Sequence, residues 1–101
     1  MPWRYGRVAV DGSSMLPALH AGDWLIVRWG AGPRPGDVVV ARRPDRPTLL
    51  IVKRAVGRTH DGWVLQGDNP RASDDSRLFG PVDDELILGR VLFRYWPPRR
   101  H

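Results

Sequence analysis

The chain has 101 residues, 42% of them hydrophobic and 27% charged, which is the composition of an ordinary globular domain. Cysteine is absent, which excludes disulfides, thiolate metal sites and catalysis by a thiol. No apolar run reaches the roughly 20 residues of a membrane-spanning helix, and no signal peptide is visible at the N-terminus. We therefore expect a cytoplasmic protein without a transmembrane segment, and peripheral contact with a membrane stays open.

The formal net charge of +5 is compatible with nucleic-acid binding, but the distribution of the charges argues against that function. All 16 basic residues except Lys53 are arginines, and they are scattered along the chain instead of forming one stripe. We expect no nucleic-acid partner. The alternative, an arginine-rich nucleic-acid binder, predicts a steep loss of affinity with salt.

Alternating and β-branched runs predict six strands in chain order. They cover residues 5–10, 23–29, 37–42, 49–56, 62–66 and 87–95. Turn signals rich in glycine, proline, aspartate and asparagine separate them, and residues 15–19 are expected to form a short helical turn. The sequence therefore predicts an all-β fold, a compact and partly open barrel, with residues 1–101 as a single domain.

Ser14 follows the first predicted strand in a Gly-Ser-Ser turn, and most serines in such turns only satisfy the turn. Gly12 adds weight, because a glycine lets the backbone approach a ligand closely. Backbone N–H groups at the end of a strand can donate to the oxyanion of an attacked carbonyl, each contributing roughly 3–4 kcal/mol in the transition state. Ser14 is therefore a candidate nucleophile.

Lys53 lies within the apolar run of residues 49–56. A lysine that accepts the proton of a serine must be uncharged, whereas its ordinary pKa is about 10.4. On a strand, Leu49, Ile51, Lys53 and Ala55 share one face, so the amine would lie among aliphatic side chains that disfavour its charged form. The alternative is a lysine at a sheet edge whose amine reaches water.

The segment 67–77 is dense in short polar side chains. It is compatible with a polar loop held by Asx turns and an ion pair. It also suits the orientation of an uncharged amine, because a serine hydroxyl can hydrogen-bond a lysine without stabilising its charge as a carboxylate would. This favours Ser73 or Ser76 as the direct partner of Lys53.

Taken together, these segments resemble type I signal peptidases, that is, signal peptidase I-like serine peptidases of the S26 type. The matching motifs are Val10-Asp11-Gly12-Ser13-Ser14-Met15-Leu16-Pro17, Gly22-Asp23, Pro35-Gly36-Asp37-Val38-Val39, Val52-Lys53-Arg54, Gly67-Asp68-Asn69-Pro70, Ser73-x-Asp75-Ser76-Arg77 and Gly80-Pro81-Val82. They occur in the order of that family and cover nearly the whole chain. Self-cleaving LexA-like repressors share the Ser/Lys pair and the fold but lack the motif of residues 67–77.

The resemblance implies a role for each matching residue. Ser14 would be the nucleophile, Lys53 the general base, and Gly12 an oxyanion-hole residue. The supporting residues would be Ser73, which hydrogen-bonds the lysine, Asp75 and Arg77, which form a structural ion pair, and Asp68 and Asn69 in the same motif. The family binds its substrate as an extended strand, so Val10, Met15 and Ile51 are expected to line the substrate pocket. The resemblance implies no metal or other cofactor.

The chain departs from type I signal peptidases in length. Those enzymes normally carry a membrane anchor before the serine and a second β-domain after the lysine, for which residues 1–13 and 54–66 are too short. A minimal, anchorless catalytic core is therefore expected. Such a core resembles the maturation proteases of nickel-type superoxide dismutase, which implies that precursor as substrate and partner. The alternatives are processing of another precursor, or a non-catalytic module that binds extended peptides.

Overall fold

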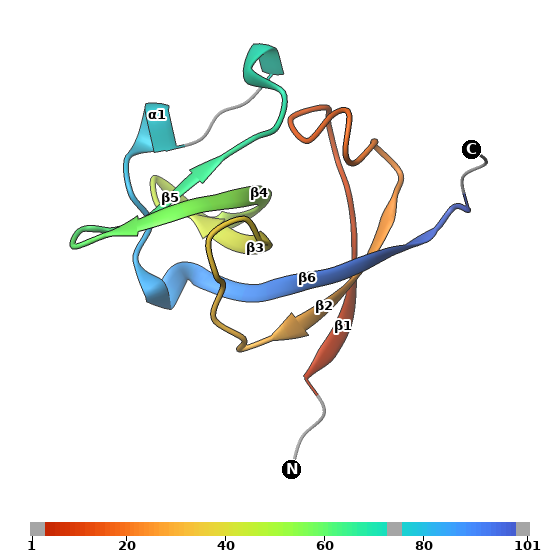
Figure 1. Ribbon diagram of the computed structural model, residues 1–101, viewed down its shortest axis with the longest axis horizontal. Helices are drawn as coiled ribbons and strands as arrows, with labels where there is room; N and C mark the ends of the chain where they lie inside the picture. The colour runs from red at the N-terminus through yellow and green to blue at the C-terminus, as the bar shows by residue number, and fades with distance from the viewer. Residues whose placement is uncertain (1–3, 73–75, 99–101) are drawn as a thin grey trace.

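The computed structural model describes residues 4–72 and 76–98, which form a six-stranded antiparallel sheet (Figure 1). The strands are β1 (Tyr5–Ala9), β2 (Trp24–Trp29), β3 (Val38–Arg43), β4 (Arg46–Thr59), β5 (Gly62–Gln66) and β6 (Ile87–Trp96). The short helices η1 (Pro70–Ala72), α1 (Ser76–Phe79) and η2 (Asp84–Leu86) lie between β5 and β6. The predicted all-β class is confirmed.

The order of strands in the sheet is β1-β2-β6-β3-β4-β5, so the last strand lies between the second and the third. β6 pairs with β2 on one side and β3 on the other, and both pairings contain register shifts. Such irregularities increase the local twist and bend of strands. The sheet is strongly coiled as a result, and β1 and β4, which are not neighbours in the sheet, line one shared cleft.

Two groups of buried side chains fill the inside of the coiled sheet. The first comprises Val10, Met15, Leu19, Leu25, Val27 and Val40. The second comprises Val39, Ala41, Ala55, Trp63, Leu65 and Val82. Successive residues of a strand point to opposite faces, so β3 sends Val40 into the first core and Val39 and Ala41 into the second.

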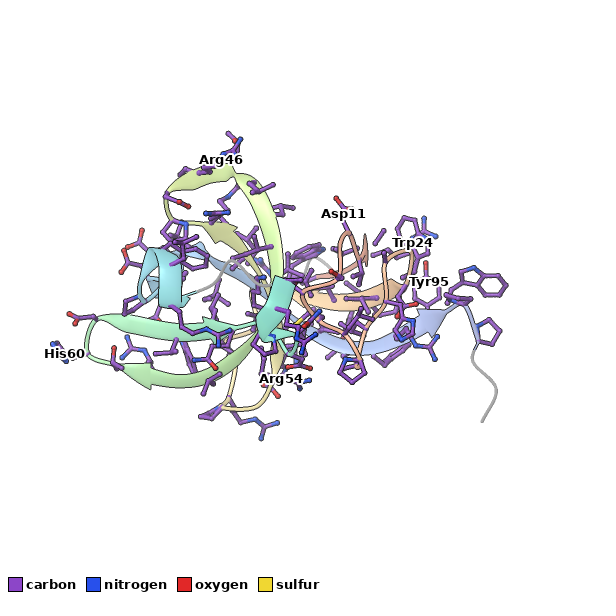
Figure 2. The ribbon with its side chains drawn as sticks, turned by 90° about the horizontal axis from the view of Figure 1, so that it is seen from above. Asp11, Trp24, Arg46, Arg54, His60 and Tyr95 are labelled. Atoms are coloured by element: carbon purple, nitrogen blue, oxygen red, sulfur yellow. The ribbon has the colours of Figure 1, made fainter. Side chains whose placement is uncertain are left out.

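The hairpin tips and one end of the sheet reach away from these cores (Figure 2). Arg46 lies at the β3–β4 hairpin and His60 at the β4–β5 turn, whereas Trp24 and Tyr95 lie together at the opposite end of the molecule. Trp24 of β2 pairs with Trp96 of β6, and both side chains are exposed. Within residues 4–72 and 76–98, no helix is long and apolar enough to cross a membrane.

Candidate active site

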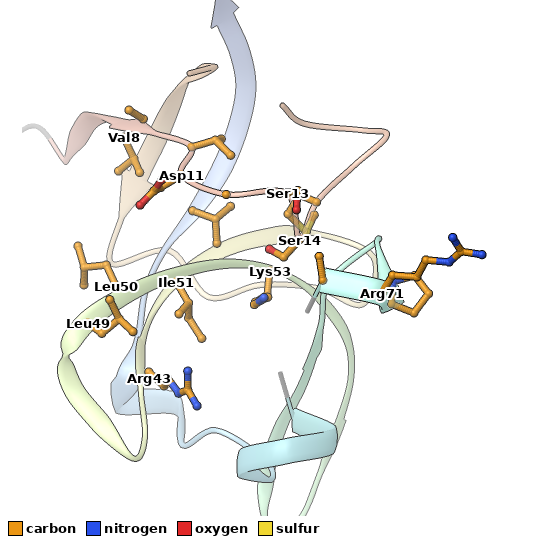
Figure 3. A pocket seen from close by; sticks show the side chains of 17 residues that line it. Val8, Asp11, Ser13, Ser14, Arg43, Leu49, Leu50, Ile51, Lys53 and Arg71 are labelled. Atoms are coloured by element: carbon orange, nitrogen blue, oxygen red, sulfur yellow. The ribbon is translucent and has the colours of Figure 1, made fainter. Parts of the chain in front are cut away.

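A cleft of about 640 Å³ opens between β1, the turn that follows it, β4 and η1 (Figure 3). Its walls are formed by Val8, Ala9, Val10, Asp11, Gly12, Ser13, Ser14, Met15, Arg43, Leu49, Leu50, Ile51, Val52, Lys53, Pro70, Arg71 and Ala72. The cleft therefore brings together the segment of Ser14 and the segment of Lys53, which are far apart in the chain.

The turn that carries Ser14 is fixed at both ends. Before it, the Val10 N–H donates to the Asp23 carbonyl at 2.8 Å, and the Gly22 N–H donates to the Val10 carbonyl at 2.9 Å. After it, Met15 is buried in the first core, with 1% of its surface exposed. Gly12 has a φ of +77°, a conformation that glycine adopts without steric cost, and it redirects the chain just before the serine.

Lys53 lies on β4 opposite Val39 of β3 and is only 5% exposed. Its side chain points into the cleft, where Figure 3 shows it next to the hydroxyl of Ser14. Ala55 is also buried, Ile51 is half-buried and Leu49 is exposed, so burial increases along this face of β4 toward the lysine. The alternative of a lysine at a sheet edge does not hold, because β4 lies between β3 and β5 and Lys53 is buried.

Asn69 holds the turn of Ser14 against η1. Its backbone N–H donates to the Ser14 carbonyl at 2.8 Å, and its side-chain Nδ2 donates to the Ser13 carbonyl at 3.0 Å. Its Oδ1 accepts the Arg71 N–H at 3.2 Å, and its carbonyl accepts the Ala72 N–H at 3.2 Å. One residue of the 67–77 motif therefore fixes both the serine turn and the start of η1.

Asp68 forms a two-pronged ion pair with Arg54. The guanidinium donates from Nη2 to Oδ2 at 2.6 Å and from Nε to Oδ1 at 3.1 Å, and its Nη1 donates to the Gly36 carbonyl at 2.9 Å. The hydrogen bond to Asp68 raises the pKa of Arg54 above its usual value. Because Lys53 and Arg54 are successive residues of a strand, they point to opposite sides, and the ion pair supports β4 from behind the amine.

The other residues proposed from the sequence lie as follows. Val10, Met15 and Ile51 line the cleft, as does Gly12. Arg77 lies exposed on α1. Ser73 and Asp75 fall outside the described residues, so their proposed roles, like the ion pair of Asp75 with Arg77, stay predictions.

Several residues of the cleft were not anticipated. Asp11 and Arg71 contribute exposed charges to its walls, and Leu49 and Leu50 contribute exposed apolar side chains. Arg43 lies farther along the cleft and donates to both carboxylate oxygens of Asp45, at 2.6 and 3.2 Å. The apolar run of residues 49–56 was the only signal for Leu49 and Leu50. Asp11 lies within one of the matching motifs and Arg71 within the segment 67–77, but the sequence assigned neither a role.

A serine hydroxyl beside a buried amine can carry out acyl transfer. An uncharged amine can accept the hydroxyl proton while the oxygen attacks a carbonyl carbon, and the same amine can then return the proton to the leaving nitrogen. The strand walls of the cleft are long enough to hold an extended peptide. β1 and β4 contribute seven of its residues in two continuous runs, 8–9 and 49–53, and Arg43 of β3 lies beyond them.

Comparison with known proteins identifies a peptidase family. The family model described as Peptidase S24-like matches residues 4–92. The chain is 38% identical to the mitochondrial ATP-independent inner membrane protease subunit 1b of Arabidopsis thaliana, over 85% of this chain and 67% of that protein. It is 34% identical to the mitochondrial inner membrane protease subunit 1 of Homo sapiens, over 91% of this chain and 70% of that protein. It is 29% identical to the mitochondrial inner membrane protease subunit 2 of Saccharomyces cerevisiae, over 90% of this chain and 68% of that protein.

These comparisons correct one expectation and leave another without support. The expectation of a cytoplasmic protein is wrong, because these relatives are proteases named for the mitochondrial inner membrane. None of the three names mentions nickel superoxide dismutase, so the resemblance to its maturation proteases is not supported by these relatives. What the comparisons do support is a peptidase with the fold shared by signal peptidase I and LexA.

Proposed function

Because this chain belongs to the Peptidase S24-like family, we propose that it is a serine endopeptidase with Ser14 as nucleophile and Lys53 as general base. The observation that carries the proposal is that a serine on a fixed turn and a lysine only 5% exposed meet in one cleft. Burial disfavours a charged amine, and an uncharged amine is what the reaction requires.

The proposed reaction has two halves. Lys53 takes the proton of the Ser14 hydroxyl as Oγ bonds to the peptide carbonyl carbon, and the carbonyl oxygen becomes an oxyanion. The backbone N–H groups of the turn that begins at Gly12 would stabilise this charge. Lys53 then gives its proton to the leaving amine as the C–N bond breaks. Water, deprotonated by the same lysine, releases the acyl group and restores Ser14.

We propose a precursor protein as the substrate, because the relatives are named as inner membrane proteases and the cleft suits an extended segment. The precursor of nickel-type superoxide dismutase remains one candidate, on the resemblance of the sequence motifs alone. The test is incubation of the purified protein with candidate precursors, followed by intact-mass measurement of both products.

We expect Ser14→Ala and Lys53→Ala each to reduce cleavage by at least about a thousandfold, and the double variant to be no worse, because the pair acts as a unit. Ser13→Ala is the matched control, since it removes a hydroxyl from the same turn and should cleave normally. Cleavage that survives Ser14→Ala would contradict the assignment. Tight peptide binding without cleavage by the wild type would favour the non-catalytic module.

We also propose that the protein works at a membrane surface, in place of the cytoplasmic location. The relatives are named for an inner membrane. Exposed aromatic side chains lie on the paired strands β2 and β6 of this chain, namely Trp24, Phe93, Tyr95 and Trp96, of which Figure 2 labels Trp24 and Tyr95. The Arg7 guanidinium lies 6.0 Å from the centre of the Trp24 ring. Tryptophan and tyrosine favour the interface of a bilayer, and arginine is attracted to anionic lipids.

Sedimentation with lipid vesicles tests this location. We expect more protein to sediment with vesicles that contain phosphatidylserine than with vesicles of phosphatidylcholine alone, and Trp96→Ala to reduce the bound fraction. Leu78→Ala is the control, because Leu78 is an exposed apolar residue on α1. Equal sedimentation of wild type and Trp96→Ala would argue against this surface.

A further inference from the structure

Two exposed charges of opposite sign lie on either side of the Ser14/Lys53 pair. Figure 3 shows Asp11 on one side of the pair, above the apolar wall of Leu50 and Ile51, and Arg71 on the other side. Both residues belong to the walls of the cleft, and both are exposed. A peptide lying along the cleft would pass one charge before the reacting bond and the other after it.

Both charges are held at fixed places relative to Ser14. Arg71 follows Asn69, whose hydrogen bonds to the Ser13 and Ser14 carbonyls and from the Arg71 N–H join η1 to the serine turn. Asp11 follows Val10, whose N–H and carbonyl are both bonded to the Gly22-Asp23 segment. The backbone positions of Asp11 and Arg71 are therefore fixed on either side of the serine.

The remaining charges of the cleft do not compete with these two. Arg43, farther along the cleft on the side of Leu49 and Leu50, donates to both carboxylate oxygens of Asp45, which balances its charge. Lys53 must be uncharged for the proposed reaction. Within residues 4–72 and 76–98, neither the carboxylate of Asp11 nor the guanidinium of Arg71 forms an ion pair.

We propose that the cleft selects its substrate by the order of charges along the peptide. A basic side chain binds on the Asp11 side of the cleaved bond, and an acidic side chain binds on the Arg71 side. This specificity rests on the proposed endopeptidase function. Exposed ion pairs contribute little energy each, so the two contacts choose among cleavable segments and leave the chemistry at Ser14 unchanged.

The test measures binding of peptides to the full chain carrying Ser14→Ala, so that no cleavage occurs. Two alanine-based peptides with blocked ends are compared, one with a lysine before a glutamate and one with the same residues in reverse order, over a range of spacer lengths. Both peptides have zero net charge, so the excess positive charge of the protein cannot distinguish them. We expect one order to bind roughly fivefold to tenfold more tightly than the other, and the difference to shrink at high salt.

Variants assign the preference to its residues. Asp11→Asn should remove the preference for the position of the lysine, and Arg71→Gln that for the position of the glutamate. Asp61→Asn and Arg46→Gln are matched controls, because both residues are exposed and lie outside the cleft. Equal binding of the two orders, no binding of either, or a preference that survives both cleft variants would overturn the proposal.

Cleavage by the wild type separates this proposal from the proposed function. If the wild type cleaves precursors and Ser14→Ala does not, the function stands whatever the peptides show. If the charge order governs binding and no precursor is cleaved, the specificity stands and the endopeptidase function fails.

Discussion

Asn69 and Ser14 are joined backbone to backbone: the Asn69 N–H donates to the Ser14 carbonyl at 2.8 Å. The side chain of Asn69 adds a second bond to the neighbouring carbonyl of Ser13 at 3.0 Å. A residue beyond β5 thus determines how the turn after β1 sits in the cleft. The motif of residues 67–77, noted in the sequence as a possible support for the lysine, therefore also supports the serine turn through Asn69.

Asn69→Ala should lower kcat more than it changes KM. The substitution removes the side-chain bond to the Ser13 carbonyl and the acceptor of the Arg71 N–H. It keeps the backbone bond to Ser14, so the serine stays in the cleft but is less firmly held. A hydrogen bond of this kind contributes about 1 kcal/mol. We therefore expect kcat to fall roughly fivefold to tenfold, and the free energy of unfolding to fall by about 1 kcal/mol. Asn69→Asp keeps an acceptor for the Arg71 N–H and lacks the donor to Ser13. If its kcat equals that of wild type, the bond to Ser13 is unimportant.

Arg54 and Asp68 should show a measurable coupling energy. The pair is two-pronged but partly exposed, with 33% and 22% of the two side chains accessible, so solvent weakens it. We expect about 1 kcal/mol from a double-mutant cycle of Arg54→Met and Asp68→Asn, measured by urea unfolding. Arg54→Lys keeps the positive charge but cannot donate to both carboxylate oxygens at once, so it should recover only part of the coupling energy. A coupling near zero would mean that the ion pair of Arg54 with Asp68 does not stabilise the fold.

The rate of cleavage should increase with pH over the range in which Lys53 loses its proton. Only the uncharged amine accepts the proton of Ser14, so the protonated enzyme is inactive. Because Lys53 is the only lysine of the chain, reductive ¹³C-methylation labels this side chain and the N-terminus alone, and NMR can follow its titration. The titration and the pH profile of kcat/KM should have the same midpoint. A lysine that stays protonated while the rate rises would contradict its role as base.

Lys53→Met should be inactive and at least as stable as wild type at neutral pH. Methionine has a similar length, and it removes an amine whose burial costs desolvation energy. Thermal unfolding of the two proteins at pH 7 compares them directly. A variant that unfolds more easily than wild type would indicate that the amine stabilises the fold, and the catalytic assignment would lose its physical basis.

Asp84 should stabilise the fold in a pH-dependent way that is unrelated to the cleft. The hydrogen bonds from Arg58, at 2.8 and 3.2 Å, hold the pKa of the Asp84 carboxyl below its usual value of 3.8. Between the pKa values of Asp84 in the folded and unfolded chain, the unfolded chain binds more protons. The contribution of Asp84 to the free energy of unfolding is therefore complete above pH 3.8 and is lost as the pH falls through the folded pKa. Wild type should therefore be slightly more stable than Asp84→Asn at pH 7, and the two should converge in acid, with equal activity throughout. If the two proteins still differ in stability at a pH below the folded pKa of Asp84, the difference does not come from the charge of the carboxylate.

The strands could be predicted from the sequence because their patterns are local. Alternation and β-branched residues gave all six, and the errors lie at the ends, as for β4, which runs over Arg46–Thr59 because its first residues pair across the hairpin with β3. The short helices between β5 and β6 have no periodic pattern and were not foreseen. The motifs also led to Ser14 and Lys53. The cleft charges Asp11 and Arg71 could not be predicted, because their position depends on how the sheet coils and on the bonds of Asn69.

The two-sided packing of β3 has a consequence for the proposed catalytic pair. Ser14 is anchored through Met15 in the first core, and Lys53 lies beside Ala55 of the second. Among the fully buried residues in the described part of the chain, β3 is the strand that belongs to both, through Val40 on one face and Val39 and Ala41 on the other. The distance between the proposed nucleophile and base therefore depends on how the two cores pack against the two faces of β3. Removing a methyl group from either face of β3 would shift one core relative to the other. The distance between Ser14 and Lys53 would change, and the cleavage rate would fall although neither side chain was altered.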